Sequence, residues 1–213
     1  MSSMQPGADE SDRAPRGRTA ERSEETRKAL VSAARALFAE RGYAGVGTEE
    51  IVRAARLTRG ALYHHFDGKQ GLFRAVYEDV ERDLVERIAK RATSVGGPLD
   101  ALRAGARAFL DACEDPAVRR IALIDAPSVL GWEEWREIGV RYGFGLIQAT
   151  LEAAMDAGVI ERQPVRPLAH LLLGSLDEAA MLVARADDRG RTEREIATAI
   201  DRQIDSLVAR TNA

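Results

Sequence analysis

The sequence predicts an all-α protein, and three observations support that fold class. Ala, Leu and Arg, which favour helices, are abundant, and runs of β-branched residues are missing. Apolar residues recur at helical spacing along most of the chain, and no segment alternates with the period of a strand. Gly and Pro breakers separate the periodic segments. We expect about nine helices, forming a small N-terminal domain with a helix-turn-helix and a larger C-terminal helical domain.

Composition and charge indicate which functional classes and cellular location fit this chain. The chain has 213 residues, of which 45% are hydrophobic and 31% charged, with a net charge of −3. The segment 21–69 carries net +2 and the segment 70–213 net −5, which favours nucleic-acid contact near the N-terminus. Cys113 is the only cysteine, which excludes an intrachain disulfide and a cysteine zinc site. There is no signal-peptide pattern and no apolar run long enough to span a membrane, so we expect a cytoplasmic protein.

The first 22 residues are polar and contain breakers, which predicts a disordered tail. This tail is either a solvated leader or a basic arm in which Arg13, Arg16 and Arg18 follow DNA phosphates or enter a minor groove. The DNA-binding domain is expected over 23–68, with Ser23 capping the first helix. Gly42 is expected to end that helix in a left-handed conformation.

Residues 48–66 are predicted to form two short helices joined by a tight turn. Thr48 and Thr58 are predicted N-caps. The predicted inner faces carry small or apolar side chains, which are Ile51, Ala54, Ala55, Leu62 and Phe66. In a helix-turn-helix the first helix crosses the DNA backbone and the second enters the major groove. Short polar side chains and Gly60, which permits close backbone approach, suit that second helix.

Residues 69–213 are expected to form a linker helix followed by an effector-binding and dimerisation domain. The linker helix begins near Lys69 and ends at Gly96-Gly97-Pro98. Helical patterns then recur at about 99–113, 116–125, 132–157, 165–186 and 192–210. The last two segments are rich in Leu and Ile and include small residues that allow close helix approach. They form either a dimer interface or a face buried within one subunit.

The N-terminal segment resembles the TetR family of repressors over about residues 26–77. The family's register is met by Thr48, Ile51, Ala55, Leu57, Thr58, Gly60, Leu62, Tyr63, His65, Phe66, Lys69 and Leu72. A looser resemblance to the ligand-binding half of such regulators continues from Val129 to Asp187. Two positions depart from the family pattern: Arg56 stands where Gly is usual, and Val52 where Ala is usual. A non-Gly residue with positive φ costs about 1 kcal/mol, so Arg56 implies slight strain or a variant turn.

The resemblance implies a sequence-specific transcriptional regulator, not an enzyme, that needs no cofactor or metal. It implies a repressor that binds a palindromic operator as a homodimer through the two C-terminal helices and is released by a small-molecule effector. Arg59 is the residue best suited to read guanine, while Tyr63 and Lys69 should contact phosphates. The complete predicted DNA-binding set is Thr48, Arg56, Thr58, Arg59, Gly60, Tyr63, His64 and Lys69.

An aromatic cluster and its apolar neighbours suggest where an effector binds, because ligand pockets are mostly apolar with a few placed polar groups. The predicted pocket comprises Phe109, Cys113, Asp125, Trp132, Trp135, Tyr142, Phe144, Gln148 and His170. Each of these residues is also compatible with plain core or dimer packing. His170 is compatible with a satisfied core histidine, and Cys113 with either an inert buried thiol or a redox sensor.

Two other classes of protein compete with this interpretation. An effector-free DNA-binding protein of the nucleoid type would lack a closed pocket. A small helical enzyme would need a convergent set of titratable side chains that no motif in the sequence offers.

Overall fold

The computed structural model describes residues 14–208, with side chains from Thr19 onward. The predicted all-α class is confirmed, since the described residues contain no strand and only an isolated bridge between Ile160 and Val208. The helices are α1 (Ala14–Arg41), α2 (Thr48–Ala54), α3 (Arg59–His65), α4 (Gly68–Ala92), α5 (Pro98–Cys113), the π-helix η1 (Val118–Asp125), α6 (Ala126–Val129), α7 (Trp132–Asp156), α8 (Val165–Arg185) and α9 (Arg189–Asp205).

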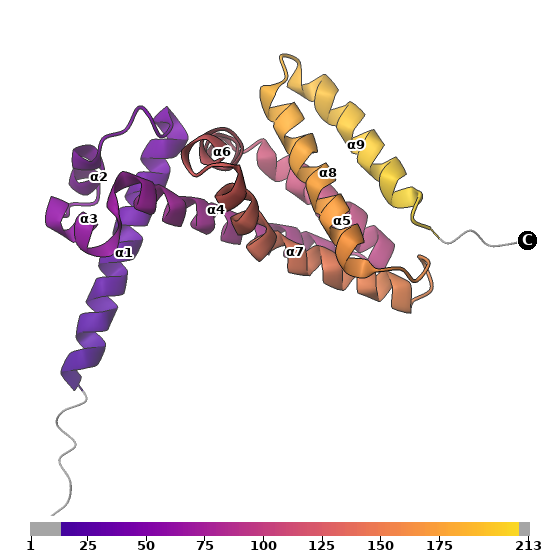
Figure 1. The fold of residues 1–213 in the computed structure, drawn as a ribbon, viewed down its shortest axis with the longest axis horizontal. Helices are drawn as coiled ribbons and strands as arrows, with labels where there is room; N and C mark the ends of the chain where they lie inside the picture. The colour runs from indigo at the N-terminus through magenta and orange to yellow at the C-terminus, as the bar shows by residue number, and fades with distance from the viewer. Residues whose placement is uncertain (1–13, 209–213) are drawn as a thin grey trace, which may run out of the picture.

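The N-terminal domain packs α1, α2 and α3 against the start of α4 at one end of the elongated molecule (Figure 1). Its core is apolar and fully buried, with an edge-to-face contact between the rings of Phe38 and Phe73 at 5.3 Å. Gly42 ends α1 with φ of 72°, as predicted from the αL cap. Further buried members of this core are Leu30, Ala34, Ile51, Val52 and Leu62.

The prediction that residues 1–22 form a disordered tail is wrong for residues 14–22, which are the first turns of α1. Ser23 therefore lies inside the helix and does not cap it. Strong helix formers and the i,i+4 pair of Glu24 with Lys28 (3.9 Å) support these exposed turns, and Pro15 lies in the first turn, where no N–H is needed. Arg13 and the side chains of Arg16 and Arg18 lie outside the described residues, so the basic-arm hypothesis stays a prediction.

Two local predictions in α2 are corrected as well. Gly47, and not Thr48, occupies the N-cap position, and no side chain caps this helix. Ala54 is exposed, whereas Val52 is buried beside Ile51. The short helix is rotated so that its two β-branched residues face α1, because they bury more apolar area than an alanine does.

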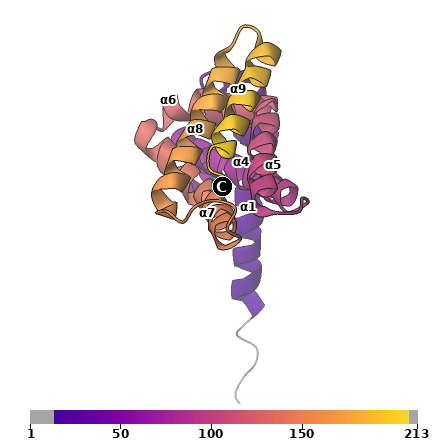
Figure 2. The ribbon, with the colours of Figure 1, turned by 90° about the vertical axis from the view of Figure 1, so that its right-hand side faces the viewer.

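The C-terminal domain is a helical bundle in which α4 and α5, α7 and α8, and α8 and α9 pack as neighbours. The helix α4 belongs to both domains: its first half packs on the N-terminal core and its second half on α5 (Figure 1). The pair α8–α9 lies at the end of the molecule away from α2 and α3 (Figure 1), and both helices face the viewer in Figure 2. Among the described helices, α8 alone is long and apolar enough to cross a membrane, with 39% of its apolar window buried inside the bundle.

Candidate DNA interface and ligand cavity

The turn between α2 and α3 holds the two helices at a defined angle. Arg56 adopts φ of 57°, the only positive φ of a non-glycine residue in the described chain. The predicted strained turn is thus present, with the N–H of Leu57 donating to the carbonyl of Val52 at 2.8 Å. Thr58 then caps α3, as predicted, because its Oγ1 accepts the N–H of Ala61 at 3.2 Å. Arg56 itself is exposed at this corner.

The outward face of α3 presents the residues predicted to meet DNA. Arg59, Gly60, Tyr63 and His64 are all exposed, and the side chain of Leu62 faces the core. The Arg59 guanidinium lies 3.1 Å from a carboxylate oxygen of Glu49 and 5.5 Å above the ring of Tyr63. The predicted guanine-reading side chain therefore forms an exposed ion pair with an acid of α2.

The side chain of Lys69 packs against the protein and does not simply extend into solvent. Its Nζ lies 4.0 Å from the centre of the Tyr43 ring. Burial lowers the pKa of Lys69, and the nearby Asp125 carboxylate acts in the opposite direction. Thr48 is half-buried at the start of α2. To contact a phosphate, the Lys69 ammonium group would have to move away from the Tyr43 ring or contact the ring and the phosphate at the same time.

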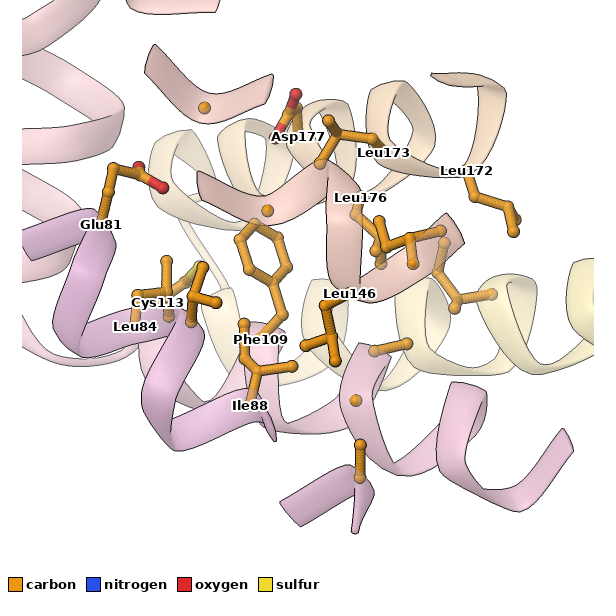
Figure 3. A pocket seen from close by; sticks show the side chains of 18 of the residues that line it. Glu81, Leu84, Ile88, Phe109, Cys113, Leu146, Leu172, Leu173, Leu176 and Asp177 are labelled. Carbon is orange, nitrogen blue, oxygen red and sulfur yellow. The ribbon is translucent and has the colours of Figure 1, made fainter. Parts of the chain in front are cut away.

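The C-terminal bundle encloses a cavity between α4, α5, η1, α7, α8 and α9. Its volume is about 90 Å³ when measured as the space open to the centre of a water molecule. One water needs about 10–15 Å³ on this measure, so the space accommodates a small organic molecule. The lining is mostly apolar, as Figure 3 shows, and includes Leu84, Ile88, Phe109, Leu146, Leu173 and Leu176.

Three of the predicted pocket residues, Phe109, Cys113 and Trp135, do line this cavity. Trp135 is buried, and its indole N–H donates to the carbonyl of Ala122 at 2.9 Å. Burial raises the pKa of Cys113 to about 12, so the thiol is protonated at neutral pH and has little thiolate character. The structure therefore favours an inert buried thiol at Cys113 over the redox-sensor hypothesis.

The other six predicted pocket residues do not line the cavity, and each has a different location. Asp125 accepts the backbone N–H of Tyr43, and Trp132 is 59% exposed. The rings of Phe144 and His170 pack on each other with centres 4.4 Å apart. Gln148 bonds to Glu152 at 2.9 Å, and Tyr142 is a half-buried neighbour of the main core. Asp125 belongs to η1, and the other five lie on α7 and α8 outside the lining of the cavity, which sequence proximity to Trp135 could not reveal.

Four polar residues outside the predicted pocket set form the polar side of the cavity. They are Tyr77 and Glu81 of α4, Arg136 of α7 and Asp177 of α8. Arg136 makes a hydrogen-bonded ion pair with Asp177. Burial raises the pKa of Asp177 to about 6, which Arg136 partly opposes, and burial raises the pKa of Glu81 to about 7. A charged residue inside an otherwise apolar helical stripe, as Glu81 is between Tyr77 and Leu84, was the available sequence signal.

An exposed helix-turn-helix joined to a helical domain with an enclosed cavity defines a DNA-binding transcriptional regulator. Residues 30–76 match the family described as bacterial regulatory proteins, tetR family, and residues 99–207 match the tetracyclin repressor-like C-terminal domain. The chain belongs to the TetR family of transcriptional regulators. Members of this family act on transcription, and the described residues contain no His, Cys, Asp and Glu group able to hold a metal ion.

Three known proteins illustrate the relationship. A TetR-family regulator from Pectobacterium atrosepticum has a TM-score of 0.80 and 32% identity, covering 89% of this chain and 97% of that chain. The Tn10 TetC protein of Escherichia coli is 29% identical over 149 residues, 70% of this chain and 75% of TetC. RolR, solved in complex with resorcinol, has a TM-score of 0.70 and 22% identity, covering 90% of this chain and 96% of RolR.

Proposed function

We propose that this protein is a repressor that binds a palindromic operator as a homodimer and leaves it when a small molecule fills the cavity. The observation that carries the proposal is that one element, η1, both lines the cavity and is hydrogen-bonded to the DNA-binding domain. Val118, Ala122 and Leu123 of η1 line the cavity, while Asp125 at its end bonds the backbone of the DNA-binding domain. RolR, which has the same fold, was crystallised with a small aromatic ligand, which is in keeping with this use of the cavity.

The DNA-binding role rests on the outward face of α3. Arg59 would form a bidentate contact with guanine after its ion pair with Glu49 breaks, and Gly60 would let the backbone approach the groove. Tyr63, His64 and Thr58 flank it on the same exposed face. Thr48, Arg56 and Lys69 lie at the helix ends and the turn, where phosphate contacts position a helix-turn-helix.

Dimerisation is proposed through α8 and α9, at the end of the molecule away from α3 (Figure 1). Leu171 is 67% exposed and Leu182 is 48% exposed on the outer surface of α8. Two large aliphatic side chains this exposed on one helix are costly to leave in water, and a second copy would cover them. Two-fold symmetry would then place two α3 helices about 34 Å apart, one turn of DNA.

Release by ligand requires that the cavity and the DNA-binding domain be mechanically connected. The Asp125 Oδ2 accepts the Tyr43 N–H at 2.7 Å, and Nη2 of Arg120 lies 3.5 Å from the carbonyl oxygen of Arg41. Both bonds hold the end of α1 and the loop that leads to α2. A ligand that displaces η1 would therefore reorient α2 and α3, provided that it binds the two arrangements unequally.

Selection of bound fragments from the source genome tests the proposal. The protein is mixed with sheared DNA, and recovered fragments are sequenced; a short palindrome lost in Arg59→Ala and Tyr63→Ala is expected. Arg91→Ala, an exposed substitution at the far end of α4, is the matched control and should retain the site. A reporter driven by the recovered site distinguishes repression from activation. Equal recovery of all fragments would instead support the effector-free, nucleoid-type class of DNA-binding protein. A binding site in the bacterial chromosome would agree with a cytoplasmic location.

A further inference from the structure

The cavity is chemically asymmetric, and its asymmetry limits what can bind there. Figure 3 shows the carboxylate of Glu81 at the left of the cavity and that of Asp177 at the top, with the ring of Phe109 in the middle and Leu172 at the right. The polar side is built by α4, α7 and α8, and the rest of the lining is mostly hydrocarbon. Its two further polar side chains are already engaged, since Thr150 donates to the carbonyl of Leu146 and Gln203 donates to Oγ of Ser175. A ligand that fills this space therefore needs an apolar body and one polar end.

The polar end carries more negative than positive charge. Arg136 is the single basic residue of the lining, and its guanidinium is already committed to Asp177. Glu81 makes no ion pair within 4.0 Å anywhere in the part of the chain that the structure describes. Its nearest polar neighbour in the lining is Tyr77. Burial raises the pKa of the Tyr77 phenol, so this group is neutral.

Glu81 has a hydrogen-bonding neighbour but no cationic one among the described residues. Burial raises the pKa of the Glu81 carboxyl to about 7, its hydrogen bond with the Tyr77 side chain opposes that rise, and the Asp177 carboxylate adds to it. The same two acids also act on the Cys113 thiol, so they share one region of low dielectric constant. A positive charge brought to this region would favour the ionised form of Glu81 and would itself be stabilised by both acids.

We propose that the cavity binds a small apolar molecule that carries a single cationic nitrogen, with the nitrogen seated against Glu81 on the side of Asp177. The proposal rests on the proposed function, because it assigns the chemical class of the effector for that site. A protonated amine supplies N–H donors to the carboxylate of Glu81, and its hydrocarbon body contacts Phe109, Leu146 and Leu176. An anionic ligand would meet Glu81 and Asp177 directly and is disfavoured by like charge.

The test compares three ligands of nearly equal shape by titration calorimetry on the full chain at pH 7.5, without DNA. They are 2-phenylethylamine, the neutral 2-phenylethanol and the anionic 3-phenylpropionate. The amine is expected to bind at least tenfold more tightly than the alcohol, and the propionate more weakly than both. Equal or tighter binding of the alcohol, preferred binding of the propionate, or no binding of the amine would overturn the proposal.

Substitution of the acid provides the second arm. Glu81→Gln keeps the size of the side chain and removes its charge, so it should weaken amine binding at least tenfold and leave alcohol binding unchanged. Glu86→Gln, an exposed substitution on the same helix, should leave both unchanged. An unchanged amine affinity in Glu81→Gln would contradict the proposed position of the nitrogen. If this variant fails to fold, the comparison of the three ligands on the unaltered chain still tests the proposal.

Operator binding is measured separately, so that the two proposals fail independently. If the protein binds a palindrome and is released by neutral compounds only, the cationic class is wrong and the regulatory function stands. If the amine binds the cavity but no DNA site is recovered, the ligand class stands and the proposed repressor function is wrong.

Discussion

The carboxylate of Asp125 accepts the backbone N–H of Tyr43 at 2.7 Å and thereby joins the last residue of η1 to the loop between α1 and α2. The two residues are 82 positions apart in the sequence. Lys69 covers the other side of this junction by lying 4.0 Å above the Tyr43 ring. The junction therefore links the cavity-lining element to both ends of the helix-turn-helix, and its loss should be visible in stability and in regulation.

Asp125→Ala should destabilise the protein by about 1–3 kcal/mol, because the Tyr43 N–H loses a charged acceptor. It should also reduce the difference in operator affinity between ligand-free and ligand-bound protein. Chemical unfolding and DNA binding with and without ligand measure the two effects. Asp187→Ala, in the exposed loop between α8 and α9, is the control. Undiminished ligand response in Asp125→Ala would show that coupling passes through α4 instead.

Removing the charge of Glu49, which pairs with Arg59, should raise the affinity for DNA although Glu49 is not in the predicted DNA-binding set. In Glu49→Gln the Arg59 guanidinium loses its 3.1 Å partner and a nearby negative charge, so affinity for all DNA sequences should rise. In Arg59→Ala operator affinity should fall by about 1–3 kcal/mol, with preference relaxed at one base pair. Fluorescence anisotropy on operator and on single-base variants measures both. A loss in Arg59→Ala that is equal for every sequence would refute base readout.

Lys69 is expected to contact a phosphate and not a base. Lys69→Ala should weaken binding to all sequences alike and lower the slope of log affinity against log salt by about one. Because the ammonium group packs on Tyr43 in the free protein, a small loss of stability should accompany this change. Binding across a salt series gives the slope, and an unchanged slope would assign Lys69 a purely structural role.

The half-buried acid Glu81 should make the free energy of unfolding depend on pH. The folded protein raises the pKa of Glu81 from 4.5 to about 7, so the folded state retains this proton more strongly than the unfolded chain. Its stabilising contribution is complete below about pH 4.5 and is lost as pH rises toward 7, at up to about 1.4 kcal/mol per pH unit. Tyr77, Cys113, Arg136 and Asp177 surround this group, and Asp177 adds a parallel trend because its own pKa is raised to about 6.

Urea unfolding from pH 5 to pH 8 checks this dependence. Glu81→Gln should flatten the decline and be more stable than the natural chain at pH 8, since it carries no charge to bury. Glu86→Gln should follow the natural chain at every pH. A decline that is equally steep in Glu81→Gln would assign the pH dependence to Asp177 or to other groups.

The sequence alone determined the fold class, the family and the helix-turn-helix, because these depend on local patterns. Helical spacing, the Thr58 cap and the αL positions at Gly42 and Arg56 are properties of adjacent residues, and all of them are present in the structure. The start of α1 was misjudged, since Pro15 and Gly17 read as breakers although a first turn tolerates proline and α1 continues through the glycine.

Only the tertiary structure decided which side chains share the cavity. Glu81, Arg136 and Asp177 lie on three helices, and the crossing of those helices brings them together. Asp125, predicted for the pocket, instead bonds a backbone group of the other domain. Helical periodicity tells which face of a helix is apolar, but it does not tell which neighbour that face meets, because interhelical packing is set by many weak contacts between residues distant in sequence.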